Sequence, residues 1–142
     1  MQVLMNIMIG EPGEISAIGE SLSPLDDWQG MEANGLSLEK LAMLQSILTG
    51  QTFDEAFDEF RPLFTASEEG PWLIRFPHSS VRQLADLEEE ALERIGEELA
   101  ASEEFETDEV AADEAQDFLV ELSQLAENAI DQDKTLFIWV GT

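Results

Sequence analysis

The segment EEGPWLIRFPHSSVRQL, residues 68–84, gathers the side chains of this chain that are best suited to binding an anion. It contains His78, the only histidine, together with Arg75 and Arg82. The segment is expected to pass from a strand into a helix, and the backbone N–H groups at the start of a helix favour a negatively charged ligand. Arg75, His78 and Arg82 are therefore the candidate ligand-binding residues.

The same three residues also have an interpretation that needs no ligand. In so acidic a chain, arginines commonly neutralise neighbouring carboxylates, and a histidine beside a proline is often simply exposed in a turn. We expect this second interpretation to hold: Arg75 and Arg82 pair mainly with local carboxylates, and His78 is not catalytic. An anion site stays open as the alternative.

No pattern in the sequence points to a metal or to catalysis. Glu104, Glu106 and Asp108 alternate as ligands of a hard cation do, but the glycine and the closing glutamate of a calcium loop are missing. With no cysteine and one histidine, a structural zinc site is not expected. The G-x-S-x-G motif and Gly-rich phosphate loops are also absent. We predict no catalytic residue, no metal and no cofactor; the sequence leaves open whether the protein is an enzyme and favours one that is not.

Charge is the dominant feature of the composition. The chain has 32 acidic and six basic residues, a net charge of −26, and residues 83–133 carry 19 acids against one base, Arg94. Such a surface repels nucleic acids and anionic membranes, and it attracts basic proteins. A basic protein is therefore the expected partner, and the candidate partner-binding residues are Glu89, Glu90, Glu93 and Glu97. The alternative is that the acidity is an adaptation to a salty cell interior.

Length and composition favour one folded domain, residues 1–142. About 100–150 residues is the commonest domain size, and 44% hydrophobic residues argue against disorder. The opening MQVLMNIMIG lacks the basic region and cleavage site of a signal peptide, and no apolar run approaches the roughly 20 residues that span a bilayer. The missing cysteines are compatible with a reducing compartment. We expect a cytoplasmic protein.

The hydrophobic pattern predicts an α+β fold. Residues 2–9 and 135–140 carry apolar side chains at both odd and even positions, as strands buried on both faces do, and residues 71–76 alternate like a strand. The predicted order is β-α-α-α-β-α-α-β, with a small mixed sheet of three or four strands covered by helices on both faces. The main helices are expected near residues 37–49, 80–101 and 108–131.

Capping residues predict where these helices begin and end. The expected N-caps are Ser37, Thr52 with Glu55 as its capping-box partner, Ser79 or Ser80, and Thr107 or Asp108. Gly50 follows the end of the first main helix, where a left-handed residue commonly stops a helix. Leu84, Leu87, Ala91 and Ile95 keep helical spacing and predict one continuous helix over residues 80–101.

Three blocks, GLSLEKLAMLQSILTGQTFDE, EEGPWLIRFP and KTLFIWV, resemble a group of uncharacterised bacterial proteins akin to the YfbM-like family, a family of unknown function. In that group a helix ending in Leu-Thr-Gly precedes a Trp-containing strand and a final aromatic strand. The resemblance covers roughly residues 35–140 and consists of core and capping positions. It implies an α+β fold and a small cytoplasmic protein, and it lends no catalytic residue.

Two classes of function are consistent with these features. The leading hypothesis is a non-catalytic protein-interaction module, inhibitor-like or immunity-like, that docks a basic partner through its acidic helices. The alternative is a small-ligand-binding protein or enzyme with an anion site near Arg75, His78 and Arg82. The sequence leaves the identity of the partner and the oligomeric state open.

The crowding of acids predicts how salt affects stability. Folding confines the 19 acids of residues 83–133 largely to two helices, and salt shortens the screening length from about 10 Å at 0.1 M to about 3 Å at 1 M. We expect the Tm, measured by circular dichroism, to rise between low salt and 1 M NaCl. Changing Glu89, Glu90, Glu93 and Glu97 to Gln should reduce that rise. If the Tm of the native protein falls with NaCl, or if the Tm of the variant rises as much as that of the native protein, repulsion among the acids does not control the salt dependence of stability.

Overall fold

A computed structural model describes residues 4–21, 23–33, 38–60, 62–65, 71–102 and 112–141. The strands are β1 (Leu4–Gly10), β2 (Gly30–Glu32), β3 (Pro62–Thr65), β4 (Trp72–Arg75) and β5 (Thr135–Gly141). The helices are α1 (Ile15–Glu20), α2 (Leu38–Thr49), α3 (Phe53–Asp58), α4 (His78–Ala85), α5 (Glu89–Ala101) and α7 (Ala112–Asp131). Two 3-10 helices, η1 (Pro12–Glu14) and η2 (Pro24–Asp26), flank α1.

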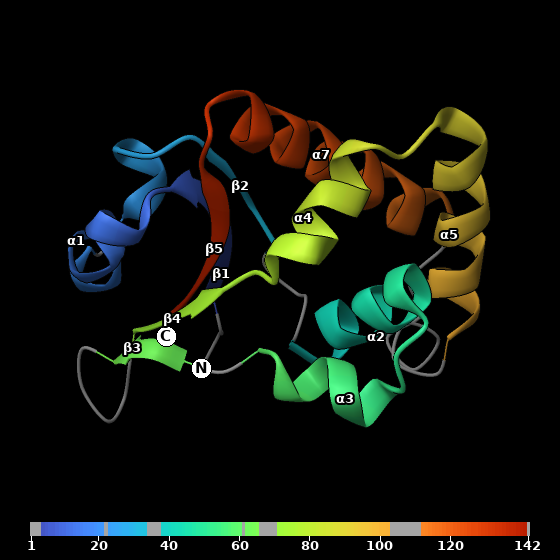
Figure 1. Ribbon diagram of the computed structural model, residues 1–142, viewed down its shortest axis with the longest axis horizontal. Helices are drawn as coiled ribbons and strands as arrows, with labels where there is room; N and C mark the ends of the chain where they lie inside the picture. The colour runs from blue at the N-terminus through green and yellow to red at the C-terminus, as the bar shows by residue number, and fades with distance from the viewer. Residues whose placement is uncertain are drawn as a thin grey trace.

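The five strands form one sheet in the order β2-β1-β5-β4-β3 (Figure 1). The last strand, β5, is central: it pairs with β1 from Leu4 opposite Gly141 to Gly10 opposite Thr135. On its other side it pairs with β4 from Trp72 to Arg75. The predicted α+β class with a small sheet is confirmed, and the C-terminal strand lies at its centre as expected.

The sheet differs from the prediction in strand direction and in number. Every pair of neighbouring strands is antiparallel rather than mixed. Burial on both faces is typical of sheets that contain parallel strands, and here helices on both sides of a fully antiparallel sheet produce it. Two short edge strands were also missed. β2 has three residues, too few to show a period, and β3 has four and begins at Pro62, a residue that cannot donate a hydrogen bond to a neighbouring strand.

Helices cover both faces of the sheet, as predicted, and create two apolar clusters. On the larger face, Ile7, Ile74 and Ile138 pack in one cluster with buried residues of α2, α4, α5 and α7. On the smaller face, Met8, Leu73, Phe137 and Trp139 pack around Ile18 of α1. Figure 1 shows α1 on one side of β5 and the remaining helices on the other. Alternate residues of β5 therefore belong to different cores.

Two tryptophans make hydrogen bonds in the layer that contains α1: Trp139 joins this layer to the sheet, and Trp28 joins two segments within it. The Trp139 indole N–H donates to the Ser21 carbonyl at 3.1 Å. The Trp28 indole N–H donates to one carboxylate oxygen of Glu14 at 2.9 Å, and the Glu11 backbone N–H donates to the other at 3.0 Å. The Trp28 hydrogen bond, followed by that from Glu11, lowers the pKa of Glu14 from its usual value.

The helix predicted over residues 80–101 is two helices, α4 and α5, separated by a turn. At the break, Glu88 is extended with φ −89° and ψ 164°. Glu89 and Glu90 then occupy the first turn of α5, where the positive end of the helix dipole favours acids. At the end of α4, the Ser123 hydroxyl of α7 donates to the Leu84 carbonyl at 2.7 Å. At the break, the Leu84 carbonyl therefore accepts a hydrogen bond from Ser123, whereas a continuous helix would pair this carbonyl with the backbone N–H of Glu88.

The predicted caps have mixed outcomes. The Thr52 hydroxyl accepts a hydrogen bond from the Glu55 N–H at 3.2 Å, and Gly50 ends α2 with φ 78°, as expected. The prediction of Ser79 or Ser80 as a cap is wrong, because α4 begins at His78 with Pro77 as its N-cap. The other expected caps, Ser37 and Thr107 or Asp108, lie outside the described residues.

Close packing joins the two acidic helices. α5 lies against α7, and a Cβ built on Gly96 of α5 would meet the Cα of Gln116 at 3.2 Å. A larger residue at position 96 would therefore force the two helices apart.

We expect Glu14→Gln to destabilise the protein more at neutral pH than in acid. Because the pKa of Glu14 is lower in the folded state, its charge stabilises the fold above the unfolded pKa and loses that effect as the pH falls through the folded pKa. Replacing a charged acceptor by a neutral one should cost about 1 kcal/mol at pH 7 and less at pH 3, measured by urea unfolding. Glu20→Gln, on an exposed side chain of α1, is the control. An equal loss at both pH values contradicts the expectation.

Thr135→Val should stabilise the fold. Thr135 is 4% exposed, and among the described residues its hydroxyl has no hydrogen-bond partner. Valine has the same shape without the buried hydroxyl, so we expect a gain of about 1 kcal/mol in the free energy of unfolding. Ser123→Ala provides the contrast, because it removes a buried hydroxyl that has a partner and should lose about 1 kcal/mol. Destabilisation by Thr135→Val would show that its hydroxyl is satisfied.

Candidate functional site

The structure places the predicted ligand-binding residues at a strand–helix junction, as expected. Arg75 is the last residue of β4, His78 is the first residue of α4, and Arg82 lies one turn later. All three side chains are exposed. Arg82 lines a cavity of about 240 Å³ together with Ala85, Asp86 and Ile130, and neither Arg75 nor His78 contributes to it. The junction was thus predicted correctly, but it does not gather the three side chains around that cavity.

The predicted partner-binding residues form part of a charged surface. Glu89, Glu90, Glu93 and Glu97 are all exposed on α5, whose opposite face buries Ile95 and Leu99. On the neighbouring helix α7, the exposed carboxylates include Glu114, Asp117, Glu121 and Glu127. We call these exposed carboxylates of α5 and α7 the acidic surface. Like charges spaced by three or four residues repel one another along each helix.

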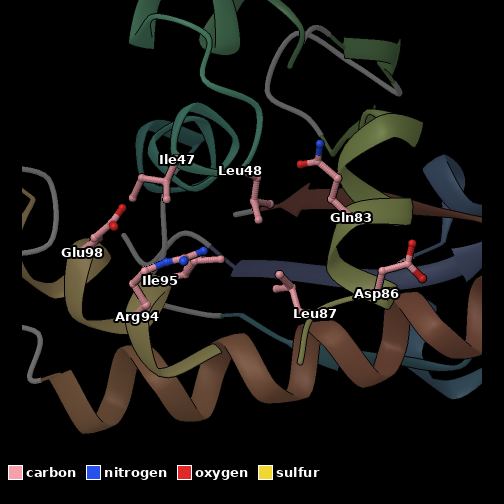
Figure 2. Close-up of a pocket in the computed structure, with 8 residues that line it drawn as sticks. All are labelled: Ile47, Leu48, Gln83, Asp86, Leu87, Arg94, Ile95 and Glu98. Carbon is pink, nitrogen blue, oxygen red and sulfur yellow. The ribbon is translucent and has the colours of Figure 1, made fainter. Parts of the chain in front are cut away.

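A groove of about 600 Å³ lies between α2, α5 and the turn that joins α4 to α5 (Figure 2). Its apolar part consists of Ile47 and Leu48 from α2, Leu87 from the turn, and Ile95 from α5. Of these, Ile47, Leu48 and Leu87 are only partly buried. We refer to this feature as the α2–α5 groove.

Polar side chains border the α2–α5 groove. Asp86 and Glu98 lie at opposite ends of the group drawn in Figure 2, and Gln83 and Arg94 complete the lining. The carboxylate of Glu98 points toward Ile47, and the Arg94 side chain reaches from α5 into the space between the two ends. Asp86, Arg94 and Glu98 are all exposed. The groove therefore combines an aliphatic floor with two carboxylates and one guanidinium.

The break between α4 and α5 forms one wall of the groove, which Gln83, Asp86 and Leu87 line. The Asp86 N–H closes the last turn of α4 by bonding to the Arg82 and Gln83 carbonyls, each at 3.2 Å. The chain then turns through Leu87 before α5 begins, so the C-terminal end of α2 is not covered by a continuous helix. Sequence reasoning placed Leu87 and Ile95 on a core stripe of one helix, and it therefore missed the groove.

A buried polar network holds α2 and α4 in place on either side of the groove. The side chain of Gln45, fully buried on α2, accepts a hydrogen bond from the Ser80 hydroxyl of α4 at 2.8 Å. Its amide donates to the Gln51 side chain at 3.0 Å, and the Thr49 hydroxyl donates to the same Gln51 oxygen at 3.0 Å. Satisfied buried networks of this kind favour one relative position of the helices they join.

Side chains that bind metals are not clustered in the described part of the chain. This part contains no group of three or more His, Cys, Asp or Glu side chains arranged to hold a metal ion. Glu104, Glu106 and Asp108, which we considered as cation ligands, lie outside the described residues. None of the described helices is both long and apolar enough to cross a membrane.

Comparisons of the chain with protein-family models, with curated proteins and with solved structures found no match in any of the three. The resemblance to the YfbM-like family stays a prediction.

We expect the triple variant Arg75→Ala, His78→Ala and Arg82→Ala to fold normally. Its affinity for inorganic phosphate should equal that of the native protein. Because all three side chains are exposed, each replacement should alter the free energy of unfolding by no more than about 0.5 kcal/mol. Urea unfolding and a phosphate titration followed by NMR provide the measurements. Saturable phosphate binding by the native protein that the triple variant loses would establish the anion site instead.

Proposed function

We propose that this protein is a non-catalytic interaction module, inhibitor-like or immunity-like, that docks a basic partner protein through its acidic surface. The observation that supports the proposal is the arrangement of α5. Its exposed positions include Glu89, Glu90, Glu93 and Glu97, and its remaining face is committed to packing against α7 and α2.

The energetics of this surface favour a positively charged partner. Carboxylates held close together on adjacent helices raise the local negative potential and repel one another, which lowers the stability of the folded state. A basic protein surface relieves that repulsion, and long-range attraction speeds its approach. The repulsion within the free protein thus becomes a source of selectivity for cationic partners.

Apolar area lies directly beside the charge. Protein interfaces typically place apolar anchors at the centre and charged groups at the rim, and a few buried anchors supply most of the binding energy. The α2–α5 groove contributes Leu48 and Leu87 to such a centre, and Asp86 and Glu98 to its rim.

The alternative, an anion-binding site or enzyme at Arg75, His78 and Arg82, has weaker support. The cavity that Arg82 lines also contains Asp86, whose carboxylate opposes the binding of an anion.

A comparison of two variants with equal charge tests the proposal. In the first, Glu89, Glu90, Glu93 and Glu97 become Gln. In the second, four exposed acids away from α5 and α7 (Glu20, Asp26, Asp27 and Glu59) become the corresponding amides. Proteins of the native host retained on each immobilised variant are quantified by mass spectrometry.

We expect the native protein and the second variant to retain a basic protein that the first variant retains at least about tenfold less, since several charge pairs of up to about 1 kcal/mol each are lost. Equal losses by both variants would show an effect of net charge alone. Retention of no basic protein by the native chain would contradict the proposed function.

A further inference from the structure

We infer that the α2–α5 groove receives a basic amphipathic helix of the partner. This inference rests on the proposed function and adds to it the place where the partner is anchored and the shape of the segment that binds there.

The groove has the dimensions and the chemistry of a binding site. Its volume of about 600 Å³ lies within the range of about 300–1,000 Å³ that is typical of pockets for compact ligands or anchoring side chains. Its floor is aliphatic, and Ile47, Leu48 and Leu87 keep part of their surface exposed. Covering that surface removes apolar area from water, which favours an occupant with its own apolar face.

The lining indicates a helix rather than an extended peptide. The described residues that line the groove come from α2, α4, α5 or the turn after α4. An extended peptide gains affinity mainly by adding hydrogen bonds to the edge of a sheet, and no strand contributes to the lining among the residues that the structure describes. A helix needs no backbone partner, and its side chains at positions i, i+3, i+4 and i+7 fit an apolar groove.

The charges on the rim determine which helix fits. Asp86 and Glu98 mark opposite ends of the lining, so a complementary helix carries Lys or Arg at both ends of its apolar stripe. Arg94, the one base among the 19 acids of residues 83–133, lies between them and repels a cation placed at the centre. This arrangement selects a helix that is basic at the ends of its stripe and apolar or acidic opposite Arg94. The net charge of −26 disfavours an anionic amphiphile in the same groove.

Two synthetic peptides of identical composition test the inference. One is an amphipathic helix of Leu, Lys and Ala with its leucines on one face and lysines at both ends of that face. The other has the same residues in a scrambled order that disperses the leucines. Affinities for both are measured by fluorescence anisotropy with the native protein, with Leu48→Gln/Leu87→Gln, and with Phe57→Gln. Phe57 is a large apolar side chain, 36% exposed, that does not line the groove, so its variant is the matched control.

The native protein should bind the amphipathic peptide at least about tenfold more tightly than the scrambled one, because only the amphipathic order lets several leucines be buried in the groove together. The ratio of the two affinities should approach one in Leu48→Gln/Leu87→Gln and stay unchanged in Phe57→Gln. Circular dichroism checks that each variant folds. A second test leaves the apolar floor intact by changing the exposed pair Asp86→Asn/Glu98→Gln. This variant should lower the affinity for the amphipathic peptide more than the control variant Glu20→Gln/Asp27→Asn does.

Failure of this inference and failure of the proposed function give different results. The variant with Glu89, Glu90, Glu93 and Glu97 changed to Gln should lower the affinity for both peptides by a similar factor and so preserve the ratio of the two affinities. If that weakening occurs but the native protein binds both peptides equally, the acidic surface attracts basic partners and the groove inference is overturned. If the ratio is large and depends on Leu48 and Leu87 but the four glutamates have no effect, the groove inference holds and the acidic surface is not the docking site.

Discussion

Burial of β5 on both faces is the constraint on which the rest of the structure depends. Leu136 and Ile138 face the larger core, and Phe137 and Trp139 face the smaller one, and none of the four is more than 4% exposed. The same strand supplies hydrogen bonds to β1 on one side and to β4 on the other. Because β5 ends the described chain and β1 begins it, the central pairing of the sheet forms only through contacts between residues distant in sequence. Both helical layers then pack on a platform that this one strand completes.

The helices lie at different distances from that platform. α4 and α7 contact β5, whereas α5 packs on α7 and α2 and lies beyond them in Figure 1. Five acids, Glu89, Glu90, Glu93, Glu97 and Glu98, are thus carried by an outer helix, where repulsion among carboxylates acts far from the sheet. A partner bound to α5 and to the α2–α5 groove would cover this outer layer without displacing the core. The satisfied network around Gln45 keeps α2 and α4 in register beneath such a partner.

Much of this arrangement could be predicted from local patterns, and the errors have specific physical causes. Apolar residues at both parities identified β1 and β5, and helical spacing identified α2 and α7, because those signals reflect which faces are buried. The junction of β4 and α4, with Arg75, His78 and Arg82 near it, was predicted for the same reason. The break before α5 was not, since Leu84, Leu87 and Ala91 keep helical spacing across it. One interaction at the break is the hydrogen bond from Ser123 to the Leu84 carbonyl, between residues 39 positions apart, which no local pattern shows. That break forms one wall of the α2–α5 groove, which was missed with it.

Native-state hydrogen exchange, followed residue by residue by NMR, tests most directly whether β5 holds the two layers together. If it does, the amides through which β5 pairs with its partner strand β1, including those of the facing residues Phe137 and Met8, exchange only when the whole molecule unfolds. The amides of α5 should then exchange through openings of lower free energy, because this helix lies on the outer layer. Exchange of β5 through local opening, or protection of α5 equal to that of β5, would contradict the central role of the strand.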